Sequence, residues 1–134
     1  MTMFGLDTNV VVRLLTNDDP QQRRKAVGFV ERLGPDHVTF VSLVAVIELD
    51  WALRSKLGFS RVDTITAISR LLQSRGLAFE HHDLILTALD LVLSKNADFA
   101  DALIACRSLE VGCQAIKTFD KKAASRVPGM ELLA

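Results

Sequence analysis

The sequence of 134 residues lacks the features that mark several common classes of protein. It contains no tyrosine, one tryptophan, three prolines and two cysteines, and sixteen basic residues balance sixteen acidic ones. Two cysteines exclude a disulfide-rich scaffold, and a net charge of zero gives no support for a partner that binds through overall charge. Any contact with nucleic acid must therefore come from a local patch of cations.

Long apolar runs are absent as well. Polar residues such as Asp7 and Asn9 interrupt the apolar N-terminal stretch, and no run approaches the roughly 18 residues of a membrane span. Cys106 and Cys113 have no histidine nearby, so they predict free thiols in a reducing cytoplasm rather than a disulfide or a zinc site. No repeat or linker-like segment divides the chain. We expect one cytoplasmic domain over residues 1–134, with no membrane partner.

The spacing of apolar residues predicts short strands that alternate with single helices. This alternation is typical of an α/β domain with a mainly parallel sheet. We expect a three-layer fold in which a central sheet of four to five strands is flanked by helices. The predicted strands are 3–7, 37–42, 77–81 and 114–119, with a last short one at 130–133, and the predicted helices are 8–17, 20–33, 43–57, 60–73, 83–94 and 98–112.

Four acidic residues are placed where the predicted elements meet. Asp7 and Asp120 each close a strand, Glu48 lies in the second turn of the helix after the second strand, and Asp101 begins the helix that leads into the fourth strand. In an open parallel sheet, ligand sites lie beyond the carboxyl ends of the strands. We therefore expect these four side chains to converge at that edge.

Four carboxylates without basic partners repel one another, so their convergence requires cations. Mg²⁺ and Mn²⁺ take oxygen ligands, and paired ions activate a water and stabilise the leaving oxygen of a phosphodiester. The absence of a histidine and cysteine cluster argues against zinc. Asn9 and Thr118, each two residues from an acid, are candidates for orienting a ligand or a water, and local turn hydrogen bonding is the alternative for both.

Structural roles compete with the chemical one at these positions. Asp7 is also suited to cap a helix, and Asp120 to begin a turn. Glu48 shares a helix face with apolar residues, whereas Asp50 is predicted to be a solvated charge and Trp51 a core residue.

The motifs "LDTNV", "VIEL", "DFADALIA" and "TFDKK", in this order and over this length, resemble those of PIN-domain proteins. More narrowly, they resemble the VapC-type toxin ribonucleases of toxin-antitoxin pairs. The resemblance implies that Asp7, Glu48, Asp101 and Asp120 form the acidic site. It also implies dependence on Mg²⁺ or Mn²⁺, endonucleolytic cleavage of structured RNA, and a homodimer neutralised by a cognate VapB-type antitoxin.

Asp98 precedes Asp101 by three residues, and its proposed role is that of a helix cap that positions Asp101. Because Asp98 lies on the same helix face, a contact with the metal through water is the alternative. Three basic residues near the acids are candidates for contacts with the RNA backbone, namely Arg13, Lys117 and Lys121.

Two helices are unusually apolar. The helix at 60–73 carries Val62, Ile65, Ile68, Leu71 and Leu72 on one face, and the helix at 43–57 is apolar almost all round. We expect a groove between them that receives an apolar segment of the antitoxin, with packing on the sheet and on each other as the alternative.

Two other functions remain open from the sequence. "LDTN" also resembles the aspartate motif of haloacid dehalogenase-like phosphatases, in which Asp7 would be the nucleophile, but that family expects a second aspartate where Asn9 stands. The other alternative is a catalytically silent PIN-like interaction module.

Overall fold

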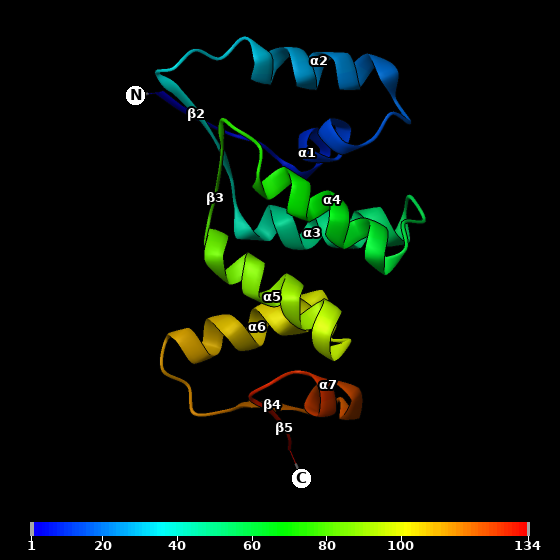
Figure 1. Cartoon of the computed structure of the whole chain (residues 1–134), viewed down its shortest axis with the longest axis vertical. Coiled ribbons are helices and arrows are strands. Elements are labelled where there is room, and N and C mark those ends of the chain that lie inside the picture. Colours follow the sequence, from blue (N-terminus) through cyan, green and yellow to red (C-terminus); the bar gives the residue numbers. More distant parts are fainter. Residues whose placement is uncertain (1, 134) are drawn as a thin grey trace. The chain divides into compact units, whose positions relative to one another are not determined.

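A computed structural model describes residues 2–133 of the chain (Figure 1). The chain divides into two compact units, of which the first runs to His82 and the second begins at Asp83. Each unit has its own parallel strand pairing.

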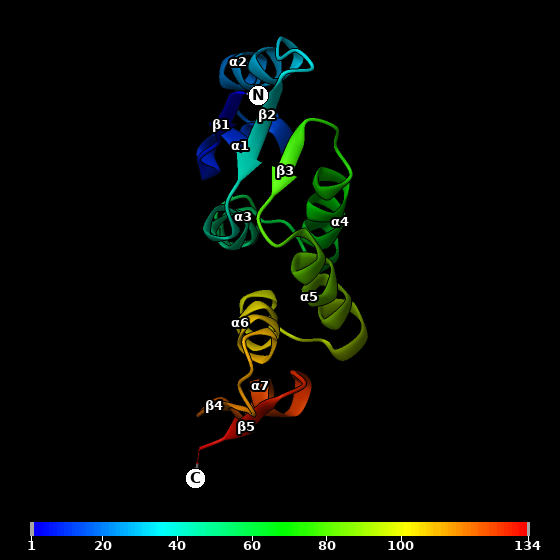
Figure 2. The ribbon, with the colours of Figure 1, turned by 90° about the vertical axis from the view of Figure 1, so that its left-hand side faces the viewer.

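The first unit contains a three-stranded parallel sheet in the order β1-β2-β3 (Figure 2). Gly5 of β1 pairs with Phe40 of β2, and Val41 of β2 pairs with Phe79 of β3. The elements in chain order are β1 (Thr2–Gly5), α1 (Thr8–Leu15), α2 (Pro20–Glu31), β2 (His37–Val41), α3 (Leu43–Ser55), α4 (Arg61–Leu72) and β3 (Leu77–Phe79).

The helices of the first unit begin where the sequence offers a capping oxygen. Ser42 accepts a hydrogen bond from the N–H of Ala45 at 3.1 Å and so caps α3, and Ser60 accepts one from the N–H of Asp63 at 3.0 Å and so caps α4. Helix α1 packs against both α2 and α3, and α3 packs against α4. The core of this unit includes Val11, Val41, Val46, Leu49, Leu53 and Ile68.

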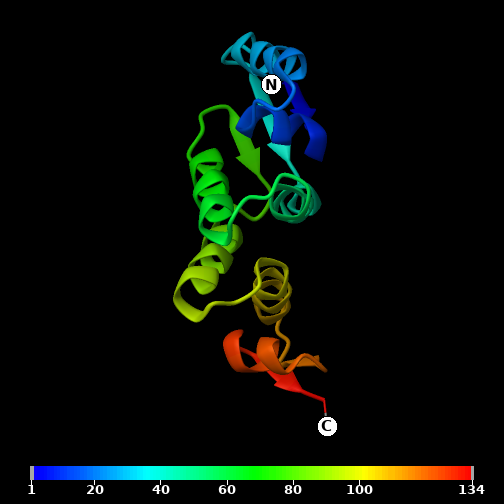
Figure 3. The ribbon, with the colours of Figure 1, turned by 90° about the vertical axis from the view of Figure 1, so that its right-hand side faces the viewer.

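The second unit is built on two helices and a small parallel sheet. Its elements are α5 (His82–Lys95), α6 (Phe99–Glu110), β4 (Ile116–Thr118), α7 (Lys121–Arg126) and β5 (Met130–Leu132). Ile116 of β4 pairs with Met130 of β5, and α7 connects the two strands and lies beside them (Figure 3). The buried side chains include Ile85, Leu89, Phe99, Leu103 and Val127.

The predicted α/β fold class with parallel strands is confirmed within residues 2–133, but pairs of helices rather than single helices connect β1 to β2, β2 to β3 and β3 to β4. The predicted sheet is corrected in one respect, because the strands pair as three and two rather than as one sheet of four to five. Helix α7 was not predicted, because six residues are too few to show helical periodicity. The helix predicted at 83–94 begins one residue earlier, at His82, so Asp83 lies within its first turn.

Candidate functional site

Asp7 stands at the junction of β1 and α1. It is exposed, its backbone is extended, and its Oδ1 accepts a hydrogen bond from the N–H of Val10 at 3.1 Å. Asp7 therefore caps α1, which is the structural role that the sequence also predicted for it. A carboxylate has about four acceptor sites, so one cap bond leaves Asp7 able to bind a cation as well.

Glu48 lies on an exposed part of α3 and is tied to α1. The hydroxyl of Thr8 donates a hydrogen bond to Oε1 of Glu48 at 3.2 Å. Because Thr8 follows Asp7 directly, this bond brings the first two predicted acids into the same neighbourhood. Thr8 was not predicted as a site residue, although its place beside Asp7 in "LDTN" was the available signal.

The other acid of α3 is buried, which corrects the prediction that Asp50 is solvated. Asp50 is only 5% exposed. Arg54, one turn further along the helix, donates to Oδ1 and Oδ2 of Asp50 at 3.1 and 2.8 Å. This bidentate pair compensates the buried charge.

Trp51 is not a core residue, contrary to prediction. Its side chain is 55% exposed, and Nζ of Lys56 lies 5.2 Å from the ring centroid. The cation–π contact gives an exposed indole a partner without burying it.

Asp98 and Asp120 both cap helices of the second unit. Asp98 Oδ2 accepts a hydrogen bond from the N–H of Asp101 at 3.1 Å, which confirms that Asp98 caps α6. Asp120 Oδ1 accepts one from the N–H of Ala123 at 3.1 Å and so starts α7. The same two residues thus define where both helices begin.

Asp101 lies within the electrostatic field of both capping aspartates. Partial burial raises the pKa of the Asp101 carboxyl above its ordinary value, and the negative charges of Asp98 and Asp120 raise the pKa further. Asp98 and Asp120, which come from two segments of the chain, thus both act on the charge state of Asp101 in this unit.

The acids supply only carboxylate oxygens, and this donor chemistry fits Mg²⁺ or Mn²⁺ rather than zinc. Burial first, and then the charges of Asp98 and Asp120, raise the pKa of Asp101, and a bound cation would oppose both effects by favouring the carboxylate. Within residues 2–133, however, no three acidic, histidine or cysteine side chains are grouped closely enough to hold a metal ion.

The two predicted supporting residues differ in role. The hydroxyl of Thr118 accepts a hydrogen bond from the N–H of Asp120 at 3.0 Å, so Thr118 stabilises the local turn and positions the capping acid. Asn9 is exposed and borders a pocket beside Asp7.

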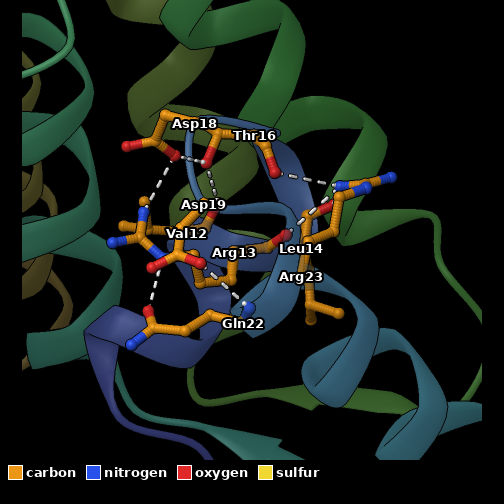
Figure 4. A network of polar contacts seen from close by, with 8 residues as sticks. All are labelled: Val12, Arg13, Leu14, Thr16, Asp18, Asp19, Gln22 and Arg23. Atoms are coloured by element: carbon orange, nitrogen blue, oxygen red, sulfur yellow. Dashed lines mark hydrogen bonds and ion pairs between the residues drawn. The ribbon is translucent and has the colours of Figure 1, made fainter.

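Two of the three predicted RNA contacts are engaged in ion pairs. Arg13 pairs with Asp18 at 2.9 Å and donates to Oε1 of Gln22 at 2.7 Å (Figure 4). Lys117 pairs with Glu131 at 2.7 Å. Lys121 is exposed and makes no ion pair in the described part of the chain.

The turn between α1 and α2 is fixed by Arg23. Its guanidinium donates to the carbonyl oxygens of Arg13, Leu14 and Thr16 at 3.2, 2.9 and 3.3 Å (Figure 4). These carbonyls belong to the C-terminal end of α1, where a cation is favoured by the helix dipole. Arg23 therefore holds α2 against the end of α1.

The apolar face of α4 that was predicted to line a groove beside α3 is buried, which corrects the prediction. Ile65, Ile68, Leu71 and Leu72 of α4 are all buried, and only Val62 of the predicted apolar face is exposed. The two helices use these faces to pack within their own unit, which was the alternative. An antitoxin segment cannot occupy surface that is already buried.

Comparison with known proteins identifies the family of the chain. The family model described as PIN domain matches residues 5–129. The chain belongs to the PIN domain family. Every predicted acid of this PIN domain lies inside the matched range. No curated protein matches the chain.

Two solved structures are similar to this PIN domain. The Mycobacterium tuberculosis toxin VapC20, which cleaves the sarcin-ricin loop, is 18% identical with a TM-score of 0.44, covering 92% of this chain and 93% of that one. A toxin-antitoxin complex from Klebsiella pneumoniae is 18% identical with a TM-score of 0.35, covering 98% of this chain and 96% of that one. Among the described residues of this PIN domain, no helix is both long and apolar enough to cross a membrane.

Proposed function

We propose that this PIN domain is a divalent-metal-dependent endoribonuclease that acts in the cytoplasm as the toxin of a type II toxin-antitoxin pair. Its reaction is the hydrolysis of phosphodiester bonds in structured RNA. The observation that carries the proposal is the PIN domain match, which spans residues 5–129 and contains all four predicted acids.

In this proposal Asp7, Glu48, Asp101 and Asp120 hold Mg²⁺ or Mn²⁺. The bound cation would lower the pKa of a water and stabilise the leaving oxygen. The chain supports its ligands with hydrogen bonds already present: Thr8 orients Glu48, Asp98 orients the first turn that carries Asp101, and Thr118 orients Asp120. Asp98 serves as a cap, with a water-mediated contact as its secondary role.

The motif resemblance extends the proposal to partners. A cognate VapB-type antitoxin neutralises the protein, two copies of the chain form a homodimer, and structured RNA is the substrate. The residues 1–134 act as a single domain in this proposal. Lys121 is the predicted RNA contact that the described structure leaves without an ion pair, so it is the first candidate for a phosphate contact.

The decisive experiment compares wild-type protein with Glu48→Gln in the presence of Mn²⁺, Mg²⁺ or EDTA. We expect the wild type to cleave structured RNA only with a divalent ion, and Glu48→Gln to lose cleavage and to bind Mn²⁺ more weakly by calorimetry. Binding of Mn²⁺ without cleavage of any RNA would assign the chain as a silent PIN module. Hydrolysis of p-nitrophenyl phosphate without RNA cleavage would assign it as a phosphatase.

A further inference from the structure

A pocket of about 480 Å³ lies between α1 and α2, beside Asp7, and the proposed cleavage does not use it. This volume is within the usual range of small-ligand sites. The pocket belongs entirely to the first unit. Its lining residues include Leu6, Asp7, Asn9, Val10, Lys25 and Phe29.

The walls of the pocket are of two kinds. Leu6, Val10 and Phe29 contribute apolar surface, and the Phe29 ring is held by an edge-to-face contact with Phe4 at a centroid distance of 5.5 Å. Asn9 adds an amide that both donates and accepts hydrogen bonds. A flat ligand with apolar faces and a polar edge suits such walls.

Three charged residues line the pocket, namely Asp7, Arg13 and Lys25. Arg13 also lines the pocket, but Asp18 pairs with its guanidinium. Lys25 is exposed and makes neither an ion pair nor a hydrogen bond within the described residues. Lys25 is therefore a cation at this pocket that no described side chain engages, while the Asp7 carboxylate is assigned to the proposed metal site.

We propose that this pocket binds one unpaired nucleotide of the RNA, with the base against Val10 and Phe29 and a phosphate at Lys25. The inference rests on the proposed ribonuclease function, because the pocket is continuous with Asp7. Sequence-specific RNA recognition uses unstacked bases that lie on aromatic side chains, and a cation engages the backbone. The arrangement would place a recognised nucleotide directly beside the cleaved bond.

A peptide is the other possible occupant, and the charge argues against it. An apolar peptide segment would contact the apolar walls but would gain no binding energy from Lys25. A nucleotide uses both the apolar walls and the cation. Neither Lys25 nor Phe29 was identified from the sequence, because helix α2 carries mixed polar and apolar residues that give no motif.

The test measures binding of a short, fluorescein-labelled single-stranded RNA by anisotropy, in EDTA so that no RNA is cut. Lys25→Ala is expected to weaken binding and to reduce the slope of log K against log salt by about 0.7, the loss of one phosphate contact on a single strand. Phe29→Leu keeps an apolar side chain but removes the aromatic face, and we expect binding to weaken at least about fivefold.

Arg24→Ala is the matched control, because Arg24 is an exposed cation of the same helix and does not line the pocket. This variant should bind RNA as the wild type does. Thermal melts of all three variants verify folding, and Lys25→Ala keeps the test decisive should Phe29→Leu unfold.

The outcomes separate this inference from the proposed function. If the wild type cleaves RNA while Lys25→Ala and Phe29→Leu bind RNA normally, the subsite is wrong and the ribonuclease stands. If the wild type cleaves no RNA yet its RNA binding depends on Lys25 and Phe29, the nucleotide subsite is supported and the ribonuclease function is rejected. If the variants bind RNA normally but no longer bind a protein antitoxin, the pocket is a peptide-binding site and the inference is overturned.

Discussion

Asp101 and Asp120 belong to different helices of the second unit, yet the charge of Asp120 helps to raise the pKa of Asp101. Both acids stand at helix N-termini, because Asp120 caps α7 and Asp101 lies in the first turn of α6. The chain has therefore placed like charges together at two helix N-termini, where the positive ends of the helix dipoles reduce the cost.

This relationship predicts how stability depends on pH. Folding raises the pKa of Asp101, so the folded protein is favoured when this carboxyl is protonated. The contribution of Asp101 to the free energy of unfolding is therefore fully present below its unfolded pKa and is lost as pH rises through its folded pKa. In EDTA, Asp101→Asn should therefore melt at a higher temperature than wild type at pH 7, and the difference should shrink toward pH 4. Asp90→Asn, at an exposed position of α5, serves as the control and should show no such change.

Asp7→Asn separates the chemistry of Asp7 from its structural role. Asparagine is as good an N-cap as aspartate, so α1 should form normally and the melting temperature should be kept. Loss of the carboxylate should lower the rate of RNA cleavage by about 100-fold or more. RNA cleavage at saturating Mg²⁺ and circular dichroism check the two expectations, and cleavage at the wild-type rate would remove Asp7 from the site.

Asp98 and Asp101 are expected to respond differently to serine. Asp98→Ser keeps an oxygen that accepts from the N–H of Asp101, so most activity should remain. Asp101→Ser removes a proposed metal ligand and should abolish cleavage. The measurement is the cleavage rate of both variants at equal Mg²⁺, and the reverse order would exchange the roles of the two acids.

Thr39 offers a test of the core of the first unit. Its side chain is fully buried on β2, and no hydrogen-bond partner for its hydroxyl is found among the described residues. Thr39→Val removes this unsatisfied group with little change of shape, so the free energy of unfolding should rise by about 1 kcal/mol. Urea denaturation measures the change.

Thr64 is the matched control for Thr39. It is equally buried, but its hydroxyl donates to the carbonyl of Ser60 at 2.8 Å. Thr64→Val loses this bond and should be neutral or destabilising. Equal effects of the two substitutions would show that the hydroxyl of Thr39 finds a partner in solution.

The sequence predicted most of the fold because its local signals agree with one another. Ser42, Ser60 and Asp98 are strong capping residues placed before apolar runs, and all three begin helices. Helix α7 escaped prediction because it is a single short element whose only signal is the cap at Asp120.

The site was less predictable, because side-chain environment depends on contacts that no local pattern encodes. Asp50 is buried because Arg54 neutralises it, and Trp51 is exposed beside Lys56, although both positions suggested the opposite. The bond from Thr8 to Glu48 spans forty residues of sequence. The convergence of Asp7, Glu48, Asp101 and Asp120 on one metal site stays a prediction.

Because Asp7 and Asp120 both cap helices, a single mutation at either codon has a specific consequence. A change from an aspartate to an asparagine codon alters one nucleotide and keeps the cap, so it removes negative charge without removing the helix start. A cell that selects against the proposed activity would then accumulate folded, inert copies of the protein rather than degraded ones. Such copies would keep the proposed contact with the antitoxin while lacking the proposed activity.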